Sequence, residues 1–423
     1  MTTNSSTLST LSRDNCRILD ETDELQSMFS KFVLPAGIVY LDGNSLGALP
    51  AASHERLNHA IQTEWGERLI TSWLRSGWME MPMRIGDKIA QLIGASAGEV
   101  VVTDSTSINV FKTLAAALAL RPDRTVILST ADNFPTDLYM AQGLAQLLGN
   151  RHELRLVDES EIEQHLDHET AVLLLTHVNY KSGRMYDMAA LTRVAHAAGA
   201  LTLWDLAHSA GAVPVDLNAC DADFAVGCGY KFLNGGPGAP AFLFVARRHQ
   251  DVFRQPLSGW LGHAQPFAFD PLYSPADGVA RYICGTPPVL SMTALECGVD
   301  LFLSTNSTNM ADVRRKSLAL SDLFIALVDQ RCAGFDLRLA TPRDPAMRGS
   351  QVSFHHPHAY EIMQALITAG VVGDFRAPDI LRFGLTPLYT RFTDIWDAVD
   401  ALRHILSSRT WDQPQFSVRK SVT

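Results

Sequence analysis

The sequence has no block of Lys and Arg, and its 423 residues carry a formal net charge of −10. A protein that follows a nucleic-acid backbone needs the opposite charge, so we expect no nucleic-acid partner. Paired C-x-x-C spacing is also missing, so neither a zinc site nor a disulfide framework is indicated. We therefore expect no metal, and reduced thiols in a cytoplasmic protein. The six cysteines are Cys16, Cys220, Cys228, Cys284, Cys297 and Cys332.

Long apolar runs are absent as well. No uninterrupted apolar stretch approaches the roughly 18 residues that span a bilayer. Residues 1–15 lack the basic start and the apolar core of a signal peptide. No G-x-G-x-x-G motif follows an early strand, which argues against a dinucleotide-binding dehydrogenase. We expect a soluble protein that is neither secreted nor inserted in a membrane.

The residues that are present predict an α/β fold. Hydrophobic residues make up 47% of the chain and charged residues 19%, which is the balance of a globular protein. Short apolar runs alternate with helical patterns, and the runs are apolar on both faces. This is typical of a mostly parallel sheet that helices cover on both sides. The predicted strands are 100–103, 125–128, 171–175, 201–204, 224–226 and 241–245.

A change of pattern after Pro287 and Pro288 divides the chain. The long helical pattern 289–303 leads into a second helix, 311–329, and then into an α+β segment with strands expected at 351–354 and 380–383. We read this part as a smaller domain that the first helix joins to the sheet domain. The predicted parts are an N-terminal segment at 1–45, a large domain at 46–288 and a small C-terminal domain at 289–423.

An acid and a lysine stand one strand–helix unit apart. Asp205 ends the predicted buried strand 201–204, and Lys231 follows it by 26 residues, just before the flexible run 234–238. A buried carboxylate is costly unless it has a partner, and a protonated pyridine nitrogen is such a partner. The Lys231 amine can bond the aldehyde of pyridoxal 5'-phosphate as a Schiff base, while Asp205 keeps the ring an electron sink. The pair predicts a pyridoxal-phosphate site.

Other candidate residues follow the predicted strands at the same edge of the sheet, where ligands of such sheets bind. Thr106 and Ser107 open a helix whose first amides would face a phosphate. Phe134 can stack on a pyridine ring, and Asp137 can orient a polar group beside it. Each position also has a plainer interpretation when it is taken alone: an ordinary helix N-cap for the first two, and a surface turn for the others.

Three further residues complete the predicted site. Thr176 ends an apolar strand, where its hydroxyl can face a ligand or simply bond to the backbone. His208 can lie over the cofactor, although a lone histidine is more often a packed core residue. Tyr230 can donate to a phosphate oxygen, and its neighbourhood favours the neutral, nucleophilic amine of Lys231.

The order of these motifs resembles the fold-type I pyridoxal-phosphate enzymes and, within them, the kynureninase family. The resemblance covers nearly the whole chain, and the stretch 259–263, Gly-Trp-Leu-Gly-His, is its most specific part. It implies a mostly parallel mixed sheet flanked by helices, with a smaller α+β C-terminal domain. The motifs that carry it lie at 43–47, 104–109, 134–137, 204–208, 230–234 and 259–263.

The resemblance also implies roles for individual residues. Lys231 anchors the cofactor and acts as a base, Asp205 pairs with the ring nitrogen, and Tyr230 relays a proton. Arg382 clamps the substrate α-carboxylate through its bidentate fork. Trp260 and Thr286 are expected from the second subunit of a homodimer. The implied cofactor-binding set is Thr106, Ser107, Phe134, Asp137, Thr176, Asp205, His208, Tyr230, Lys231, Trp260 and Thr286, and the implied substrate-binding set is Arg382, Ser45 and Trp73.

The implied activity is hydrolysis of the Cβ–Cγ bond of L-kynurenine to anthranilate and L-alanine, in tryptophan catabolism, kynurenine degradation or NAD biosynthesis. Animal relatives that prefer 3-hydroxykynurenine carry a His and an Asn where this chain has the Ser72–Trp73 region and Thr286. The less polar pocket is expected to turn over the hydroxylated substrate less well.

Three alternatives remain open from the residues themselves. A cysteine desulfurase or selenocysteine lyase needs a reactive thiol on a mobile loop, whereas Cys332 follows a predicted helix without such a loop motif. An aminotransferase would turn over with 2-oxo acids. A cofactor-binding homologue without activity would be expected to lack Lys231 or Asp205, and both are present.

Overall fold

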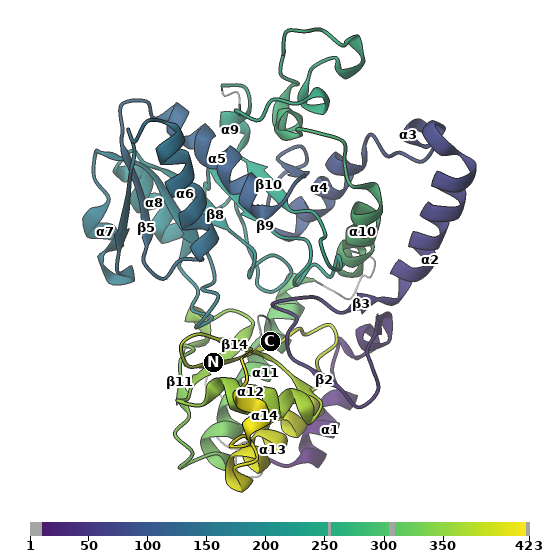
Figure 1. The fold of residues 1–423 in the computed structure, drawn as a ribbon, viewed down its shortest axis with the longest axis vertical. Helices are drawn as coiled ribbons and strands as arrows, with labels where there is room; N and C mark the ends of the chain where they lie inside the picture. Colours follow the sequence, from purple (N-terminus) through teal and green to yellow (C-terminus); the bar gives the residue numbers. More distant parts are fainter. Residues whose placement is uncertain (1–10, 253–254, 304–308, 420–423) are drawn as a thin grey trace. The chain divides into compact units, whose positions relative to one another are not determined.

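The computed structural model describes residues 11–252, 255–303 and 309–419 (Figure 1). These residues form two compact units. The larger unit contains 52–180 and 185–303, and the smaller one contains 11–51, 181–184 and 309–419. Within the described ranges, no helix has both the length and the apolar composition needed to cross a bilayer.

A seven-stranded sheet forms the centre of the larger unit, in the order β4-β10-β9-β8-β7-β5-β6. Strand β10 runs antiparallel to its neighbours β4 and β9, and the pairs from β9 to β6 are parallel. The mostly parallel sheet predicted from the apolar runs is therefore confirmed. The strands are β4 (Val100–Val102), β5 (Val126–Thr130), β6 (Glu153–Val157), β7 (Thr170–Thr176), β8 (Leu201–Asp205), β9 (Phe224–Gly227) and β10 (Phe242–Val245).

Helices pack on this sheet because each presents an apolar face to strands that are buried on both sides. Helix α5 packs on β7, β9 and β10, while α8 packs on β8 and α4 on β4. The helices of this unit are α2 (Ala51–His59), α3 (Ser72–Arg75), α4 (Met81–Leu92), α5 (Thr106–Leu120), α6 (Pro135–Leu147), α7 (Ile162–His165), α8 (Met188–Ala197), α9 (Arg247–Gln250) and α10 (Val289–Leu303).

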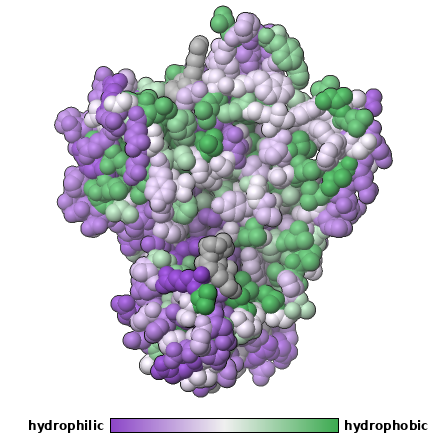
Figure 2. All heavy atoms as spheres, in the orientation of Figure 1, coloured by the Kyte–Doolittle hydropathy of each residue, from purple (hydrophilic) through white to green (hydrophobic). Residues whose placement is uncertain are grey.

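Helix α2 continues into a π-helix, Ala60–Glu67, and a 3-10 turn, Leu69–Thr71, before α3. We call residues 51–75 the arm. It stands apart from the sheet, at the right of Figure 1, and carries several exposed apolar side chains (Figure 2). The exposed apolar residues of the arm are Ile61, Trp65, Leu69, Ile70 and Leu74.

The smaller unit is built on a four-stranded antiparallel sheet in the order β11-β12-β15-β14. Helices α11 (Met310–Arg331), α12 (Ala359–Thr368) and α13 (Phe392–Ser408) enclose its apolar core, with α1 (Arg13–Glu21) against α13 and α14 (Pro414–Ser417) against α12. The strands are β11 (Arg338–Leu339), β12 (Gln351–His355), β14 (Asp374–Arg376) and β15 (Ile380–Gly384), with two short pairs, β1 (Phe32–Val33) with β3 (Leu49–Pro50) and β2 (Val39–Tyr40) with β13 (Val371–Val372).

The two units differ from the predicted division in two places, the N-terminal segment and helix α10. The N-terminal segment belongs to the smaller unit, because β2 pairs with β13 and Arg13 Nε lies 2.7 Å from Asp397 Oδ1. Helix α10 belongs to the larger unit and packs on α4, where Arg84 bonds to Glu296 at 2.9 Å. A Cβ on Gly298 would lie 2.1 Å from the Leu233 carbonyl oxygen, so glycine permits this close approach.

Candidate active site

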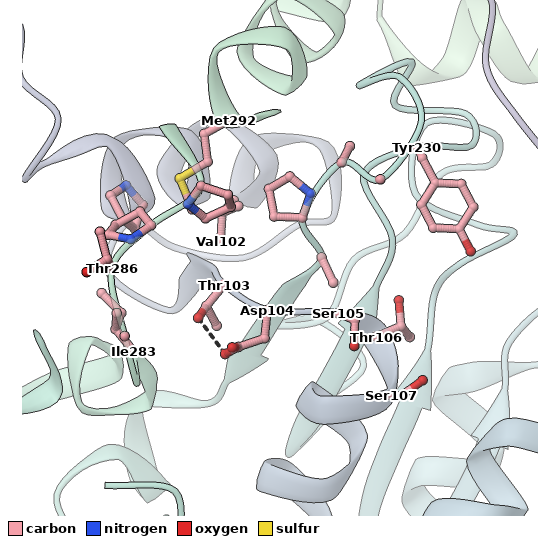
Figure 3. Close-up of a pocket in the computed structure, with 18 of the residues that line it drawn as sticks. Val102, Thr103, Asp104, Ser105, Thr106, Ser107, Tyr230, Ile283, Thr286 and Met292 are labelled. Atoms are coloured by element: carbon pink, nitrogen blue, oxygen red, sulfur yellow. Dashed lines mark hydrogen bonds between the residues drawn. The ribbon is translucent and has the colours of Figure 1, made fainter. Parts of the chain in front are cut away.

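A cavity of about 640 Å³ lies in the larger unit, beside the carboxyl ends of β4 and β5. Residues 103–107, which follow β4, form one wall together with Phe134 and Asp137, which follow β5. Figure 3 shows Tyr230 on the side of Thr106 and Ser107, with Thr286 across the cavity. Ligands of such sheets bind at this edge, as the sequence predicted.

The turn between β4 and α5 forms an anion cradle. Ser105 Oγ accepts from the Ile108 amide at 3.4 Å and caps the helix, so the first turn of α5 points its amides toward the cavity wall. Thr106 Oγ1 is buried and has no hydrogen-bond partner among the described residues. A buried hydroxyl without a partner is unfavourable, and a phosphate oxygen would satisfy it.

Two buried carboxylates, Asp137 and Asp205, interact with each other. Asp205 ends β8 and is 2% exposed, and its Oδ1 accepts from the Ala207 amide at 2.8 Å. Asp137, in the first turn of α6, is 1% exposed, and its Oδ2 has no hydrogen-bond partner in the part of the chain that the structure describes. Burial raises the pKa of both groups, and the charge of Asp205 raises the pKa of Asp137 further.

Such a pair needs either a proton or a cation. The positive charge of Lys231 opposes both pKa increases. A pyridinium N–H would supply a hydrogen and a positive charge to the two acids at once. The acid pair and the unpartnered hydroxyl of Thr106 thus fit the two ends of pyridoxal 5'-phosphate.

Lys231 lies in the loop after β9, among ring side chains. Its Nζ is 3.0 Å from His208 Nε2 and 5.9 Å from the ring centroids of Phe134 and Tyr230. Burial, together with the charges of Cys228 and Asp205, holds the pKa of Tyr230 well above its usual range. Tyr230 therefore keeps its proton and can donate it.

Thr176 and Asn133 form a bridge between β7 and the turn after β5. The hydroxyl of Thr176 donates to Asn133 Oδ1, which also accepts from the Thr176 amide at 3.1 Å and from the Phe134 amide at 2.8 Å. The Thr176 hydroxyl therefore bonds to a side chain 43 residues away and not to the backbone, as the plainer alternative would require. Sequence reasoning gave Asn133 no role, although it immediately precedes Phe134.

Trp260 and Trp73 lie on segments outside the sheet and its connecting turns. Trp260 is on an exposed loop, 37% exposed, with its ring 5.7 Å from that of Phe267. Trp73 is on the arm, edge-to-face with Trp78 at 5.7 Å. Neither lines the cavity within this chain, whereas Thr286 does.

A buried glutamate that sequence reasoning missed organises the arm around Trp73. Glu64, in the π-helix, is 4% exposed and accepts from Trp78 Nε1 at 3.0 Å. Arg56 pairs with it at 2.9 Å, and Ser72 Oγ donates to its carbonyl at 2.5 Å. A π-helix in such a place is a common mark of a functional segment.

The smaller unit holds Arg382 and Ser45 in one cluster. Arg382, on β15, donates through Nε to Asp374 Oδ1 at 2.7 Å and through a terminal nitrogen to Ser45 Oγ at 2.9 Å. The pairing of β14 with β15 places Asp374 opposite Arg382, and Arg376 bonds to the same carboxylate at 2.6 Å. Burial and the charge of Asp374 raise the pKa of Asp42, beside them, to about 7.

Two guanidinium groups thus share the carboxylate of Asp374. Sequence reasoning found Arg382 and Ser45 but missed Asp374, Arg376 and Asp42, because only the strand register brings them together. When Asp42 is protonated, two guanidinium groups face the single carboxylate of Asp374, and this excess positive charge suits a carboxylate ligand.

Known proteins match this chain along most of its length. The model of the kynureninase C-terminal domain matches residues 313–402, and that of the DegT/DnrJ/EryC1/StrS aminotransferase family matches residues 60–225. Among solved structures, a cysteine desulfurase from Thermococcus onnurineus NA1 superposes with a TM-score of 0.76 at 19% identity, over 90% of this chain and 98% of its own. The cystine C–S lyase C-DES, in complex with cysteine persulfide, gives a TM-score of 0.76 at 17% identity, over 87% and 98%.

These structural neighbours share the fold alone and confirm the predicted architecture. The curated relatives are much closer. Kynureninases of Burkholderia pseudomallei (strain 1106a) and Pseudomonas fluorescens are each 56% identical over 416 residues, covering 97% of this chain and 99% of the relative. The chain therefore belongs to the kynureninase family.

Proposed function

We propose that this chain uses pyridoxal 5'-phosphate to hydrolyse the Cβ–Cγ bond of L-kynurenine, giving anthranilate and L-alanine. Within the site, the observation that carries the proposal is the buried pair of Asp137 and Asp205, which the charge of Lys231 stabilises. When bound, pyridoxal 5'-phosphate would supply an electron sink for the carbanionic charge at the substrate carbons.

The residues of the larger unit hold the cofactor and move protons. Thr106, Ser107 and the first turn of α5 bind the phosphate. The amine of Lys231 anchors the cofactor, and after release it removes the proton from the substrate Cα. Water would add to the γ-carbonyl carbon, which leaves as the carboxylate of anthranilate, and Tyr230, whose pKa burial raises, would deliver a proton to the substrate Cβ.

The remaining assignments concern the substrate. Arg382 and Ser45 bind its α-carboxylate, and Trp73 with Thr286 bounds its aromatic ring. Since neither of the last two offers an imidazole or an amide to a ring hydroxyl, L-3-hydroxykynurenine is turned over less well. The six cysteines are all free, in keeping with a cytoplasmic location.

A homodimer completes the proposed site. Apolar side chains of this size rarely stay exposed in numbers on a monomer. On the arm, Ile70 is 74% and Leu74 80% exposed, and on the loop after Trp260, Phe269 is 78% exposed. A second copy of the chain would cover them and bring Trp260 to the partner's cofactor, whereas Thr286 already lines the cavity of its own chain. Sedimentation of the wild type and of Leu74→Arg tests this: a monomeric wild type contradicts the dimer.

A cysteine desulfurase is the second candidate from the same fold, and the solved neighbours include one. Such an enzyme needs an accessible thiolate. Cys332 is 3% exposed, and burial raises its pKa to about 11. The thiol is therefore protonated and inaccessible, which favours carbon–carbon cleavage over desulfuration.

One assay separates these functions. The purified protein is expected to show the visible absorption of bound cofactor and to release fluorescent anthranilate from L-kynurenine, faster than 3-hydroxyanthranilate from the hydroxylated substrate. Lys231→Ala should abolish release, whereas Lys31→Ala, at an exposed position, should not. No cofactor absorption, or full activity in Lys231→Ala, would overturn the proposal, and equal rates on both substrates would overturn the pocket assignment.

A further inference from the structure

A second buried lysine lies beside the cofactor cavity. Lys112, on α5, is 0% exposed. Its amine pairs with Asp104 and donates to the Tyr282 carbonyl at 2.6 Å. Lys112 has no part in the proposed reaction.

The partner of Lys112 is Asp104, which lies in the turn between β4 and α5. Asp104 lines the cavity together with Thr106 and Ser107 (Figure 3), and its side chain is 28% exposed. Its backbone is left-handed, with φ of +49°, which aspartate tolerates better than most residues. Thr103 Oγ1 donates to the same carboxylate at 2.7 Å. This conformation redirects the chain from β4 into the helix that forms the anion cradle.

The turn therefore places a carboxylate on the wall that receives a phosphate dianion. Two like charges in a partly dehydrated cavity repel each other strongly, because the effective dielectric constant is well below that of water. Thr103 donates a hydrogen bond but no charge. The charge of Asp104 must be cancelled from behind, and among the described residues Lys112 is the cation paired with it.

We propose that Lys112 is a positioning residue for the cofactor: it neutralises Asp104 so that a phosphate can bind beside it, and it ties the cradle to the segment that carries Thr286. The inference rests on the proposed function. The second contact of the amine supports it, since Tyr282 begins that segment. The charge of Lys112 also reaches Cys284, where it opposes the rise in pKa that burial causes.

A purely structural ion pair is the competing explanation, and the smaller unit contains a matched example. Lys316 is 7% exposed, lies 2.6 Å from Asp23 and donates to the Pro387 carbonyl at 2.6 Å. Its chemistry is the same as that of Lys112: one carboxylate and one backbone carbonyl. Lys316→Met therefore reproduces the loss of a buried lysine without altering the charge beside the cradle.

The test compares two aldehydes that differ only in the phosphate. Apoprotein is titrated with pyridoxal 5'-phosphate and with pyridoxal, and binding is followed by absorption. Lys112→Met should weaken the binding of pyridoxal 5'-phosphate about 10-fold or more, and that of pyridoxal less than about 3-fold. This difference is expected because the repulsion acts on the phosphate. Lys316→Met should leave the ratio of the two dissociation constants unchanged.

Two further variants separate charge from folding. Asp104→Asn with Lys112→Met removes both charges and should restore the ratio to within about 3-fold of the wild type. Asp104→Asn alone leaves the charge of Lys112 in place. The ratio of the two dissociation constants should then stay the same or shift in favour of pyridoxal 5'-phosphate. This variant tests the proposal even if Lys112→Met does not fold. Equal weakening of both aldehydes in Lys112→Met, or a ratio shifted toward pyridoxal in Asp104→Asn, would overturn the inference.

The same titrations distinguish a failure of the proposed function from a failure of the role proposed for Lys112. A wild type that binds neither aldehyde contradicts the function itself. A wild type that binds the cofactor, with Lys112→Met behaving as Lys316→Met does, leaves the function standing and removes only the role of Lys112.

Discussion

Two buried aspartates lie at opposite ends of adjacent parallel strands. Asp205 ends β8, is 2% exposed and receives a hydrogen bond from the Ala207 amide. Asp223 precedes β9, is 1% exposed and is surrounded by donors. Those donors are His196 at 2.7 Å, His249 at 2.7 Å, Arg248 at 2.8 Å and the Thr202 amide at 2.8 Å.

Their pKa values move in opposite directions. Burial raises the pKa of Asp205 despite the positive charge of Lys231. Burial acts on Asp223 as well, but the bonds from His196 and His249 prevail and hold its pKa well below the usual range. A buried acid is therefore no sign of function by itself. A buried acid indicates a binding site when the surrounding protein groups do not fully compensate its charge, so that a ligand can do so.

The largest effect is expected from breaking the functional member of the pair. Asp205→Asn removes the charge that would hold a pyridinium proton, so kcat should fall at least about 100-fold, the usual cost of losing one preorganised electrostatic contact. The free energy of unfolding should be unchanged or about 1 kcal/mol higher, because a poorly compensated charge is removed. Steady-state kinetics and urea unfolding measure the two effects. If Asp205→Asn were much less stable than the wild type but fully active, Asp205 would be a structural residue and not a functional one.

At Asp223, on the other end of the strands, a substitution is expected to lower stability and to leave activity nearly unchanged. Asp223→Asn removes the negative charge that two histidines and an arginine share and replaces one acceptor oxygen by a donor, so it should lower the free energy of unfolding by about 3 kcal/mol. Activity per folded molecule should stay within about twofold of the wild type, since surface and structural changes far from the chemistry leave transition-state binding intact. Unfolding by urea and an active-site titration check both values. A selective loss of kcat would contradict the structural role.

The pH dependence of stability sharpens the same contrast. The hydrogen bond that His196 donates to Asp223 raises the pKa of His196, with help from the charges of Asp223 and Asp221 and against burial and the charge of Arg248. Its contribution is therefore complete below about pH 6.5 and is lost as the pH rises through the folded-state pKa. Asp223, with its lowered pKa, contributes above about pH 3.9 and loses its contribution as the pH falls.

Both groups therefore stabilise the fold together between about pH 4 and pH 6.5. The difference in unfolding free energy between the wild type and His196→Gln should be larger at about pH 5.5 than at about pH 8.5. Equal differences at the two pH values would show that His196 contributes no charge to the cluster.

The smallest effect is expected from the exposed neighbour of the cluster. Asp221 lies 3.4 Å from His196 and 2.8 Å from Arg248, but its side chain is 67% exposed. Solvent screens such pairs, so Asp221→Asn should change the free energy of unfolding by at most about 0.5 kcal/mol. Asparagine also tolerates the left-handed φ of +53° at this position. A loss as large as that of Asp223→Asn would mean that burial does not distinguish the two acids.

The sequence indicated the reactive residues of the site more readily than the residues that hold them in place. Lys231 and Asp205 stood out because a lysine in an apolar loop and an acid after a buried strand are unusual wherever they occur. Asn133, Glu64 and Asp374 did not, because a polar residue near a turn or on a helix is ordinary until its partner is known. Each of these supports acts on a candidate residue found from the sequence: Phe134, Trp73 and Arg382.

Local patterns alone determined the class of fold. Runs that are apolar on both faces must be buried on both faces, and their alternation with helices leads to a mostly parallel sheet whatever the details. The order of motifs likewise determined the family. Both properties depend on residues close together in the chain, which a sequence displays directly.

Only the tertiary structure decided which charges meet. Lys112 reaches the carbonyl of Tyr282, 170 residues away, and Asp374 faces Arg382 through the register of two strands. Helix α10 joined the larger unit because Gly298 admits the backbone of Leu233, a contact that no local pattern predicts. Compensation of a buried charge is a long-range property, and it is what separates Asp205, kept for a ligand, from Asp223, used by the fold.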